Sequence, residues 1–421
     1  MTNQQTYNHI PALRFPDFAN DGEWEDYSIE EVFDIRNGYT PSKSKSEYWE
    51  NGSIPWFRME DIRANGNILS DSIQHITPEA IKGFGLFPAY SIIVATSATI
   101  GEHALITVES LANQRFTYLS KKKPFENRVD MLYFHYYMFV IDEWCKKNTN
   151  TGGFLSVNMS AFRQLRIPIP PLAEQQRIAA CLSAVDEMIN AANGKLEQLK
   201  AYKKGLMQKL FPAKGKKLPE LRFKEFEKDG EWEEKKLGEL LMEVKETTTD
   251  TNKIPLYSLT IDDGVTSKTE RYERGFLVTK KDNVFKVVSP NDFVSNPMNL
   301  RFGAVGYNQN AFSVCVSGYY DVFRFKEDGT SVFWNNYLKS DLLLHKYDEI
   351  AIGSLIEKRR VYFSNLQNLK VFVPSVCEQR KIASCLSIMD DQINAYTEKF
   401  ALLRQYKKGL MQRMFPQNKI I

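Results

Sequence analysis

Two segments of this 421-residue chain occur twice, and the repeat limits its architecture more than any other feature. Leu13–Phe15 (LRF) and Gly22–Glu25 (GEWE) return 208 positions later as Leu221–Phe223 and Gly230–Glu233. Solenoid repeats are roughly 20 to 50 residues long, far shorter than this period. The repeat therefore indicates one duplicated unit of about 200 residues rather than an array of small ones.

A second pair of repeated segments closes each half of the chain. Tyr202–Gln208 (YKKGLMQ) returns as Tyr406–Gln412, and Glu174-Gln175 returns as Glu378-Gln379, both 204 positions later. Residues 25–165 and 233–370, which lie between the repeated ends, match each other only in a few glycines and apolar runs. We therefore expect two different modules inside one repeated frame.

The repeated segments carry a heptad pattern of apolar residues, which predicts long helices that pack along a seam. The first copy would run from Leu172 to Leu210 and reach roughly 58 Å at 1.5 Å per residue. Pro171 suits an opening turn, and Ser375–Glu378 has the pattern of a capping box. The seam residues are Ile178, Leu182, Val185, Ile189, Leu196, Leu199, Ile382, Leu386, Met389, Ile393, Phe400 and Leu403.

The two helices could pair in either direction, or form an ordinary buried pair within one core. Antiparallel pairing would give the chain a pseudo-twofold axis and two similar faces for two copies of one partner. We predict an α+β fold with two α/β modules and two long helices in an antiparallel coiled coil. The expected segments are 1–170 (first module), 171–212 (first helix), 213–374 (second module) and 375–421 (second helix).

Each module is expected to contain a strand, a polar loop and a second strand. Ser91–Val94 and Asp292–Val294 precede loops that close at Ile100-Gly101 and Phe302-Gly303. Apolar, aromatic-rich stretches at 131–145 and 333–344 are predicted to be helices that fill the core, because clustered aromatic side chains usually do so.

The chain lacks the sequence patterns of common catalytic sites. It has no phosphate loop, no G-x-S-x-G elbow, no H-E-x-x-H pair and no G-x-G-x-x-G after a strand. Its five histidines are isolated in sequence, so no metal site is predicted, and its five scattered cysteines predict free, buried thiols. The start lacks a secretory signal and no run approaches ~20 apolar residues, so we expect a cytoplasmic protein without membrane contact.

Polar loops with basic side chains remain as candidate DNA contacts, although solvated loops have the same composition. Cations bind phosphates and release counterions, while arginine and amide side chains can read base edges. The net charge is only +3, so any basic surface must be local. The candidates are Lys43, Lys45, Arg58, Arg63, Thr96, Ser97 and Thr99 in the first module, with Lys268, Arg271, Arg274, Asn296, Asn299, Arg301, Lys358, Arg359 and Arg360 in the second.

The chain resembles the specificity subunit of type I restriction-modification systems over essentially its whole length. The resemblance is carried by Gly38–Ser42 (GYTPS), Gly52–Trp56 (GSIPW), Ile167–Ala179 (IPIPPLAEQQRIA) and the LRF and GEW repeats. The second half departs from this pattern, because it lacks the GYTPS segment and has Ser375–Cys377 where the first half has Pro-Leu-Ala.

This resemblance implies a subunit without catalysis of its own, in which two target recognition domains each read one half of a split, asymmetric DNA site. In the family, helices set the spacer and bind two modification subunits, which use S-adenosylmethionine to methylate adenine N6. Restriction subunits add ATP- and Mg-dependent translocation and cleavage. The partners implied are double-stranded DNA and both kinds of subunit, with no cofactor on this chain. An enzyme and a coiled-coil adaptor without DNA readout are the alternatives.

Overall fold

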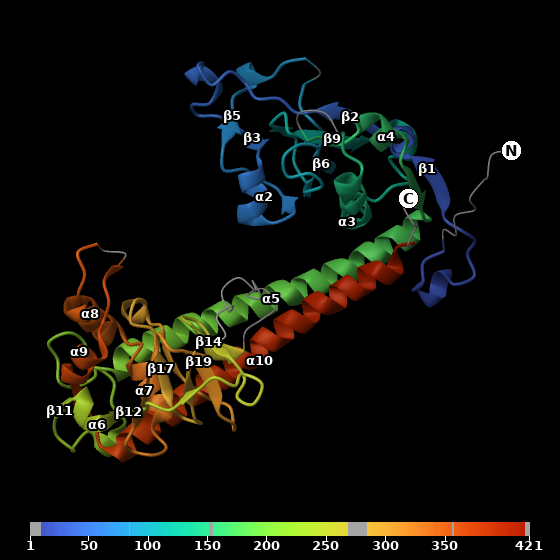
Figure 1. Ribbon diagram of the computed structural model, residues 1–421. Helices are drawn as coiled ribbons and strands as arrows, with labels where there is room; N and C mark the ends of the chain where they lie inside the picture. Colours follow the sequence, from blue (N-terminus) through green and yellow to red (C-terminus); the bar gives the residue numbers. More distant parts are fainter. Residues whose placement is uncertain (1–9, 84, 151–154, 268–283, 356–357, 417–421) are drawn as a thin grey trace. The chain divides into compact units, whose positions relative to one another are not determined.

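The computed structural model describes residues 10–83, 85–150, 155–267, 284–355 and 358–416 (Figure 1). It divides into unit 1, which comprises 1–192 and 399–421, and unit 2, which comprises 193–398. From the sequence, the helices are expected as segments apart from the modules. In the structure, each long helix instead contributes one part to unit 1 and another part to unit 2.

Both predicted long helices are present, and each has 39 residues. They are α5 (Leu172–Leu210) and α10 (Val376–Met414). The Ser375 hydroxyl accepts the Glu378 backbone N–H at 3.3 Å, as a capping box requires. The Glu378 carboxylate, however, binds other side chains described below, so only half of the predicted capping box forms.

Within unit 1, the beginning of α5 lies beside the end of α10. Ile178 and Leu182 share a hydrophobic core with Met414, which is followed by Phe415. Further along, Lys407 Nζ lies 2.6 Å from Asp186 Oδ1. Early residues of one helix therefore meet late residues of the other, which makes the pairing antiparallel in this unit.

Unit 2 has the same arrangement with the roles of the helices exchanged. Leu210 at the end of α5 shares a core with Ile382 and Leu386 near the start of α10, and Lys203 Nζ lies 2.6 Å from Asp390 Oδ1. The antiparallel prediction is confirmed within each unit. All twelve predicted seam residues are buried or half-buried.

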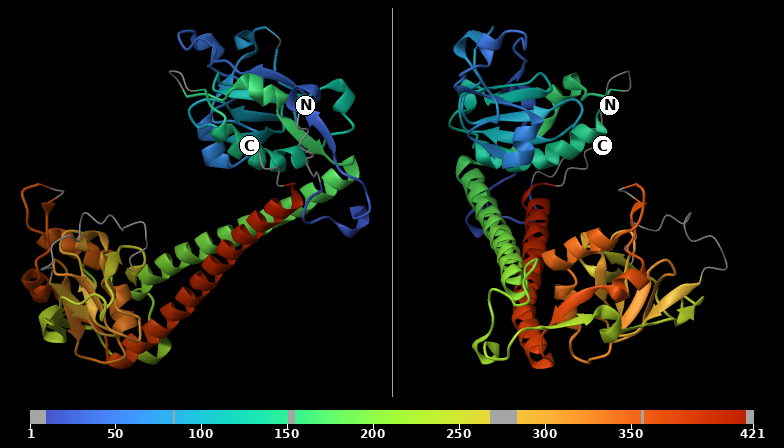
Figure 2. Two further views of the ribbon diagram at one scale, coloured as in Figure 1. Left: turned by 45° about the vertical axis from the view of Figure 1, so that its right-hand side comes forward. Right: turned by 90° about the vertical axis from the view of Figure 1, so that its left-hand side faces the viewer.

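Unit 1 is built on a five-stranded sheet of order β2-β9-β6-β7-β4, in which only the β4–β7 pairing is parallel. The sheet is drawn in blue to cyan in Figure 2. A smaller sheet has the order β5-β3-β8. The elements are β1 (Glu25–Ser28), α1 (Ile29–Val32), β2 (Phe33–Asn37), β3 (Ile54–Phe57), α2 (Met59–Asn65), β4 (Ile68–Leu69), β5 (His75–Ile76), β6 (Ser91–Ala95), β7 (His103–Ile106), β8 (Leu111–Ala112), β9 (Phe116–Lys121), α3 (Met131–Lys147), α4 (Met159–Gln164) and β10 (Arg166–Ile169).

Helix α3 confirms the predicted aromatic helix of the first module. Its Tyr133, Phe134 and Tyr136 are each about 1% exposed and belong to the hydrophobic core of unit 1. The Phe134 ring lies 4.4 Å from the ring of Phe33 at the start of β2. These rings therefore serve as core, as the sequence analysis expected.

Unit 2 contains a four-stranded sheet of order β12-β20-β17-β18 and a three-stranded sheet of order β13-β16-β19. The predicted helix at 333–344 is instead two helices, because Ser340 takes an extended conformation (φ −68°, ψ 150°) and begins the second one. The elements are β11 (Glu233–Lys236), α6 (Leu237–Leu240), β12 (Leu241–Glu243), β13 (Thr247–Thr248), β14 (Tyr257–Thr260), β15 (Gly264–Ser267), β16 (Phe285–Val288), β17 (Phe293–Ser295), β18 (Val305–Tyr307), β19 (Val314–Ser317), β20 (Asp321–Phe325), α7 (Ser331–Tyr337), α8 (Asp341–Ile350), α9 (Phe363–Asn368) and β21 (Lys370–Val373).

In each unit, a buried ion pair joins the repeated LRF and GEWE segments to the repeated glutamate near the start of a long helix. We call this cluster the latch. In unit 1, two nitrogens of Arg14 each lie 2.8 Å from an oxygen of Glu174, and Trp24 donates its indole N–H to the same carboxylate at 3.2 Å. The Glu174 side chain is only 1% exposed. The latch of unit 2 consists of Arg222, Glu378 and Trp232, at 2.9, 2.8 and 3.2 Å.

Each module is also closed by an antiparallel strand pair at its two ends. Strand β1 pairs with β10 in unit 1, and β11 pairs with β21 in unit 2. Of the cysteines, Cys145 and Cys315 are buried as expected, whereas Cys377 is exposed and the other two are half-buried. None of the described helices is both long enough and apolar enough to span a membrane.

Candidate nucleic-acid interface

Three polar loops meet at one end of the large sheet of unit 1, and we call this surface the first polar edge. It consists of residues 37–42, 96–101 and 113–115. The Thr117 hydroxyl donates to Asn37 Oδ1 at 2.9 Å and lies 3.2 Å from the Thr96 hydroxyl. The backbone N–H of Thr96 also donates to the carbonyl of Arg115 at 3.1 Å. These bonds hold loops distant in sequence side by side.

The GYTPS segment is held against this edge by backbone contact and by tryptophans. A Cβ on Gly38 would lie 2.2 Å from the carbonyl oxygen of Ala112, so no larger residue fits without moving the loop. Trp49 donates its indole N–H to the Ser42 carbonyl at 3.0 Å, and Trp56 does the same to the Tyr39 carbonyl at 3.0 Å. The segment is thus positioned by its neighbours.

The predicted cations of the first module differ in how free they are. Lys45 and Arg58 have acidic neighbours, Glu47 at 3.5 Å and Glu60 at 3.9 Å. Arg58 is half-buried and lies 5.8 Å from the Trp56 ring. Of the other predicted residues of this module, Lys43 and Arg63 are exposed, while Thr96, Ser97 and Thr99 are half-buried.

The segment that follows β8 is not among the contacts predicted from the sequence. The backbone N–H of Asn113 donates to the Phe57 carbonyl at 3.1 Å, and Asn113 Oδ1 accepts the backbone N–H of Arg115 at 3.0 Å. The Thr40 hydroxyl donates to Gln114 Oε1. Gln114 and Arg115 are exposed. The available signal was an amide beside a guanidinium in the loop between β8 and β9, which a search for runs of basic residues overlooks.

A buried histidine network supports the 96–101 loop from behind. His103 Nδ1 lies 2.8 Å from Asp142 Oδ2 on α3, and His103 Nε2 lies 3.1 Å from the His135 carbonyl oxygen. Burial raises the pKa of the Asp142 carboxyl above its ordinary value. Burial, together with the nearby His103 and Lys407, places the pKa of His135 well below its ordinary value. His135 is therefore neutral in the folded protein near pH 7.

The corresponding loop of unit 2 connects β17 to β18 and uses its predicted residues differently. Asn296 Oδ1 accepts the backbone N–H of Met298 at 3.0 Å, so this side chain stabilises a turn. Asn299 is exposed. The Arg301 side chain is only 8% exposed and pairs with Asp348 of α8 at 3.3 Å, so it is largely committed within unit 2.

The basic run near residue 360 lies at the same end of the unit 2 sheet. The backbone N–H of Val361 donates to the Pro297 carbonyl at 2.9 Å, which joins the two loops. Arg359 pairs with Asp348 at 3.2 Å. Lys358 and Arg360 are exposed, and Arg360 lies 5.7 Å from the ring of Tyr319. Lys268, Arg271 and Arg274 lie outside the described residues.

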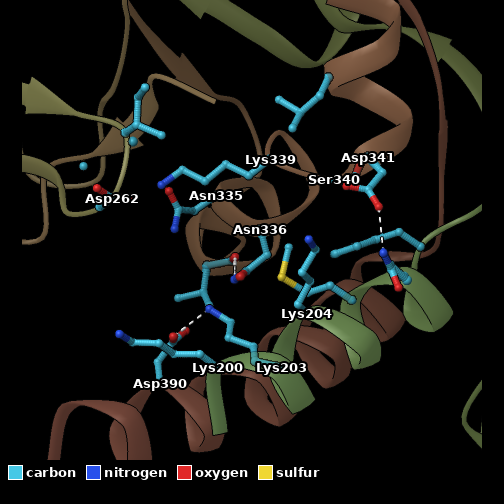
Figure 3. A pocket seen from close by; sticks show the side chains of 18 of the residues that line it. Lys200, Lys203, Lys204, Asp262, Asn335, Asn336, Lys339, Ser340, Asp341 and Asp390 are labelled. Atoms are coloured by element: carbon cyan, nitrogen blue, oxygen red, sulfur yellow. Dashed lines mark hydrogen bonds and ion pairs between the residues drawn. The ribbon is translucent and has the colours of Figure 1, made fainter. Parts of the chain in front are cut away.

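Unit 2 also has a polar cleft of about 1130 Å³ between its helical segments and α7–α8 (Figure 3). Five lysines and five aspartates line it, including the paired Lys203 and Asp390. Burial lowers the pKa of Lys339, which lies above this pair. Because its charges balance, the cleft does not favour a ligand of either sign. Among the described residues, no three His, Cys, Asp or Glu side chains gather as around a metal ion.

Comparison with known proteins places these features in a family context. Residues 21–201 and 229–403 match the family described as "Type I restriction modification DNA specificity domain". The chain is 34% identical over 387 residues to the type I restriction enzyme EcoprrI specificity subunit of Escherichia coli, covering 89% of each. It is 28% identical over 226 residues to the MjaIX specificity subunit of Methanocaldococcus jannaschii, covering 52% of each.

A solved structure shares this fold. The crystal structure of the type I restriction-modification system S subunit from M. genitalium aligns with a TM-score of 0.56 at 16% identity, covering 97% of this chain and 99% of that one. At this level of identity the likeness supports the fold, which agrees with the predicted mixed architecture of two modules and two long helices.

Proposed function

Because the chain belongs to the type I restriction-modification DNA specificity family, we propose that each unit reads one half of a split, asymmetric DNA site. One observation carries this proposal. The two units have the same latch, but the loops of the first polar edge differ from the loops at the corresponding end of the unit 2 sheet. Similar frames would place two sensors in equivalent environments, while unlike loops would recognise different base sequences.

We further infer that the chain is the non-catalytic subunit of a complex. The paired, repeated helices would bind two modification subunits, and restriction subunits would join through them. S-adenosylmethionine, ATP and Mg would then be bound by those partners, and the methyl transfer and cleavage would occur there. The unread spacer between the half-sites would be set by the length of α5 and α10.

The decisive experiment exchanges residues 25–165 for the same region of a related subunit. Methylome sequencing of cells that carry the chain with its partner subunits reports the recognised sequence directly. We expect only one half of the motif to change. A change in both halves would contradict reading by separate units.

A second experiment inserts one heptad in both helices. This insertion should change only the spacer between the half-sites.

Salt dependence separates this proposal from an adaptor that does not touch DNA. A complex that binds phosphates loses affinity steeply as salt rises, because bound counterions are released on association. An adaptor would contribute no such slope, so complexes with and without this chain would show the same salt dependence. Methyl transfer to DNA by the purified chain alone would instead identify it as an enzyme.

A further inference from the structure

We propose that Arg115 and Gln114 read base edges in the first half-site, Arg115 a guanine and Gln114 a neighbouring adenine. This inference rests on the proposed function and assigns its specificity in unit 1 to two residues. The loop that carries them, 113–115, lies at the centre of the first polar edge, between the GYTPS segment and the 96–101 loop.

The backbone around Arg115 is fixed while its side chain is free. Its N–H donates to Asn113 Oδ1 at 3.0 Å and its carbonyl accepts from Thr96 at 3.1 Å. Arg115 is exposed, and no ion pair of its guanidinium occurs among the described residues. A guanidinium on a rigid loop can donate two parallel hydrogen bonds to guanine O6 and N7, which is the commonest specific contact in the major groove.

Gln114 is oriented for a different base. Its Oε1 accepts the Thr40 hydroxyl, which holds the amide beside the GYTPS segment. An amide oxygen has two lone pairs, so Oε1 can also accept from adenine N6 while Nε2 donates to N7. Thr40 belongs to the GYTPS segment, which Gly38 and the two tryptophans hold in place. Thr40 is therefore a positioning residue.

The equivalent loop of unit 2 carries different chemistry. In unit 1, β9 pairs with β6, the first strand of the strand–loop–strand turn. In unit 2, β20 pairs with β17, the first strand of the corresponding turn, so β20 takes the place of β9. The loop before β20 is Gly318–Tyr320, with Tyr319 41% exposed beneath Arg360. It offers no forked donor of its own, so the Arg115 and Gln114 contacts belong to unit 1 alone.

The test compares the methylomes of cells whose complex contains the unaltered chain, Arg115→Ala or Gln114→Ala. We expect Arg115→Ala to lower discrimination about 5- to 150-fold at one G·C pair of the first half-site. Gln114→Ala should relax one A·T pair in the same half-site, and Thr40→Val should have a weaker effect at that position. The second half-site should be unchanged in all three variants.

Each alternative outcome has a clear meaning. If Arg115→Ala weakens binding equally to all sequences and lowers the salt slope by about one, Arg115 contacts a phosphate and the inference is wrong. An unchanged motif, or a change in the second half-site, also contradicts it. If the unaltered chain yields no split motif, the proposed function itself fails, which distinguishes the two failures.

Arg163→Ala serves as the matched control. Arg163 is an exposed arginine of the same unit on α4, which precedes β10. Leu165, two residues later, accepts a backbone hydrogen bond from Ile29 before β2, whereas the first polar edge begins at the other end of β2. Removing this charge should leave the motif and its discrimination unchanged.

Discussion

The first polar edge and its counterpart in unit 2 are built on similar turns but supported by different chemistry. In unit 1, Gly101 (φ 92°) packs against the backbone of Asp142, whose carboxylate binds the buried His103. In unit 2, a Cβ added at Gly303 (φ 90°) would lie 3.8 Å from Leu344 Cδ2, the flexible end of that side chain. The turn geometry is shared, while its support and exposed residues are free to differ.

The latches, in contrast, are almost identical in both units. Each places one arginine, one tryptophan and one glutamate at distances that agree within 0.1 Å. The repeated residues therefore attach each module to its helix. The residues that differ between the units lie in the exposed loops or support those loops from inside. Four predictions test this division, from the largest expected effect to the smallest.

Removing the latch carboxylate should have the largest effect, and it should be equal in both units. Glu174→Ala and Glu378→Ala each leave a buried arginine without its partner, which destabilises by about 3–5 kcal/mol. Hydrogen–deuterium exchange in increasing urea reports the stability of each unit separately. Glu187→Ala and Glu398→Ala, which remove exposed helix glutamates, are the controls. Clearly unequal losses would show that the two latches differ energetically.

Alanine at the two loop glycines should separate the units. Both positions have positive φ, which disfavours alanine by about 1 kcal/mol. At Gly101 the added Cβ would also lie 2.9 Å from the Asp142 carbonyl oxygen, so overpacking adds about 1–3 kcal/mol. Urea unfolding should therefore show a larger loss for Gly101→Ala than for Gly303→Ala. Equal losses would mean that the loop of unit 1 moves away from α3 at little cost.

Mild acid should destabilise unit 1 more than unit 2. Because the pKa of His135 is lowered in the folded state, the unfolded state binds a proton below pH 6.5 that the folded state does not. Unit 1 should lose up to about 1.3 kcal/mol between pH 7 and 5.5 by this route, which is the limit for a histidine that stays neutral in the folded state. His345, the histidine of unit 2, is exposed.

The variant His135→Phe provides the check on this pH effect. It should remove the difference between pH 7 and 5.5 in the urea unfolding of unit 1, while His345→Ala should change nothing. Measurements stay above pH 5.5 because protonation of Asp142, whose pKa is raised, relieves its burial at lower pH and acts in the opposite direction. An unchanged pH profile in His135→Phe would assign the effect to another group.

The repeated lysine–aspartate pairs should show the smallest difference. Lys407 lies 5.1 Å from the Tyr136 ring, and the Tyr136 hydroxyl donates to the same Asp186 at 2.8 Å. Lys203 instead faces the cleft, where Lys339 repels it. We expect Lys407→Met to cost about 1 kcal/mol and Lys203→Met less than about 0.5 kcal/mol in thermal unfolding. A larger loss for Lys203→Met would contradict this.

The frame could be predicted well because the repeated segments and the heptad spacing are visible in the sequence without knowledge of long-range contacts. The bounds of α5, the antiparallel pairing in each unit and the strand–loop–strand turns agree with the structure. The stretch expected to be helical at 333–344 is helical except at residues 338–340, where the extended Ser340 separates α7 from α8.

The candidate contacts could be predicted less well, because composition does not reveal long-range partners. Arg301 and Arg359 both turn to Asp348, a residue that no local pattern connects to Arg301, 47 positions away. Arg115 was missed for the opposite reason, since an isolated arginine gains significance only when folding places its loop beside other loops, here through Thr96 to Arg115 and through Thr40 to Gln114.

The latch and the terminal strand pair together tie the two ends of each module to its helix. A module from a related chain that carries the matching arginine and tryptophan would form the same ion pair with the helix glutamate, whatever the sequence of its outer loops. Exchange of the gene segment that encodes a module would then replace all of its outer loops in one event and keep its attachment to the helix. The buried salt bridge would in this way allow related chains to differ in the DNA sequence that we propose they read.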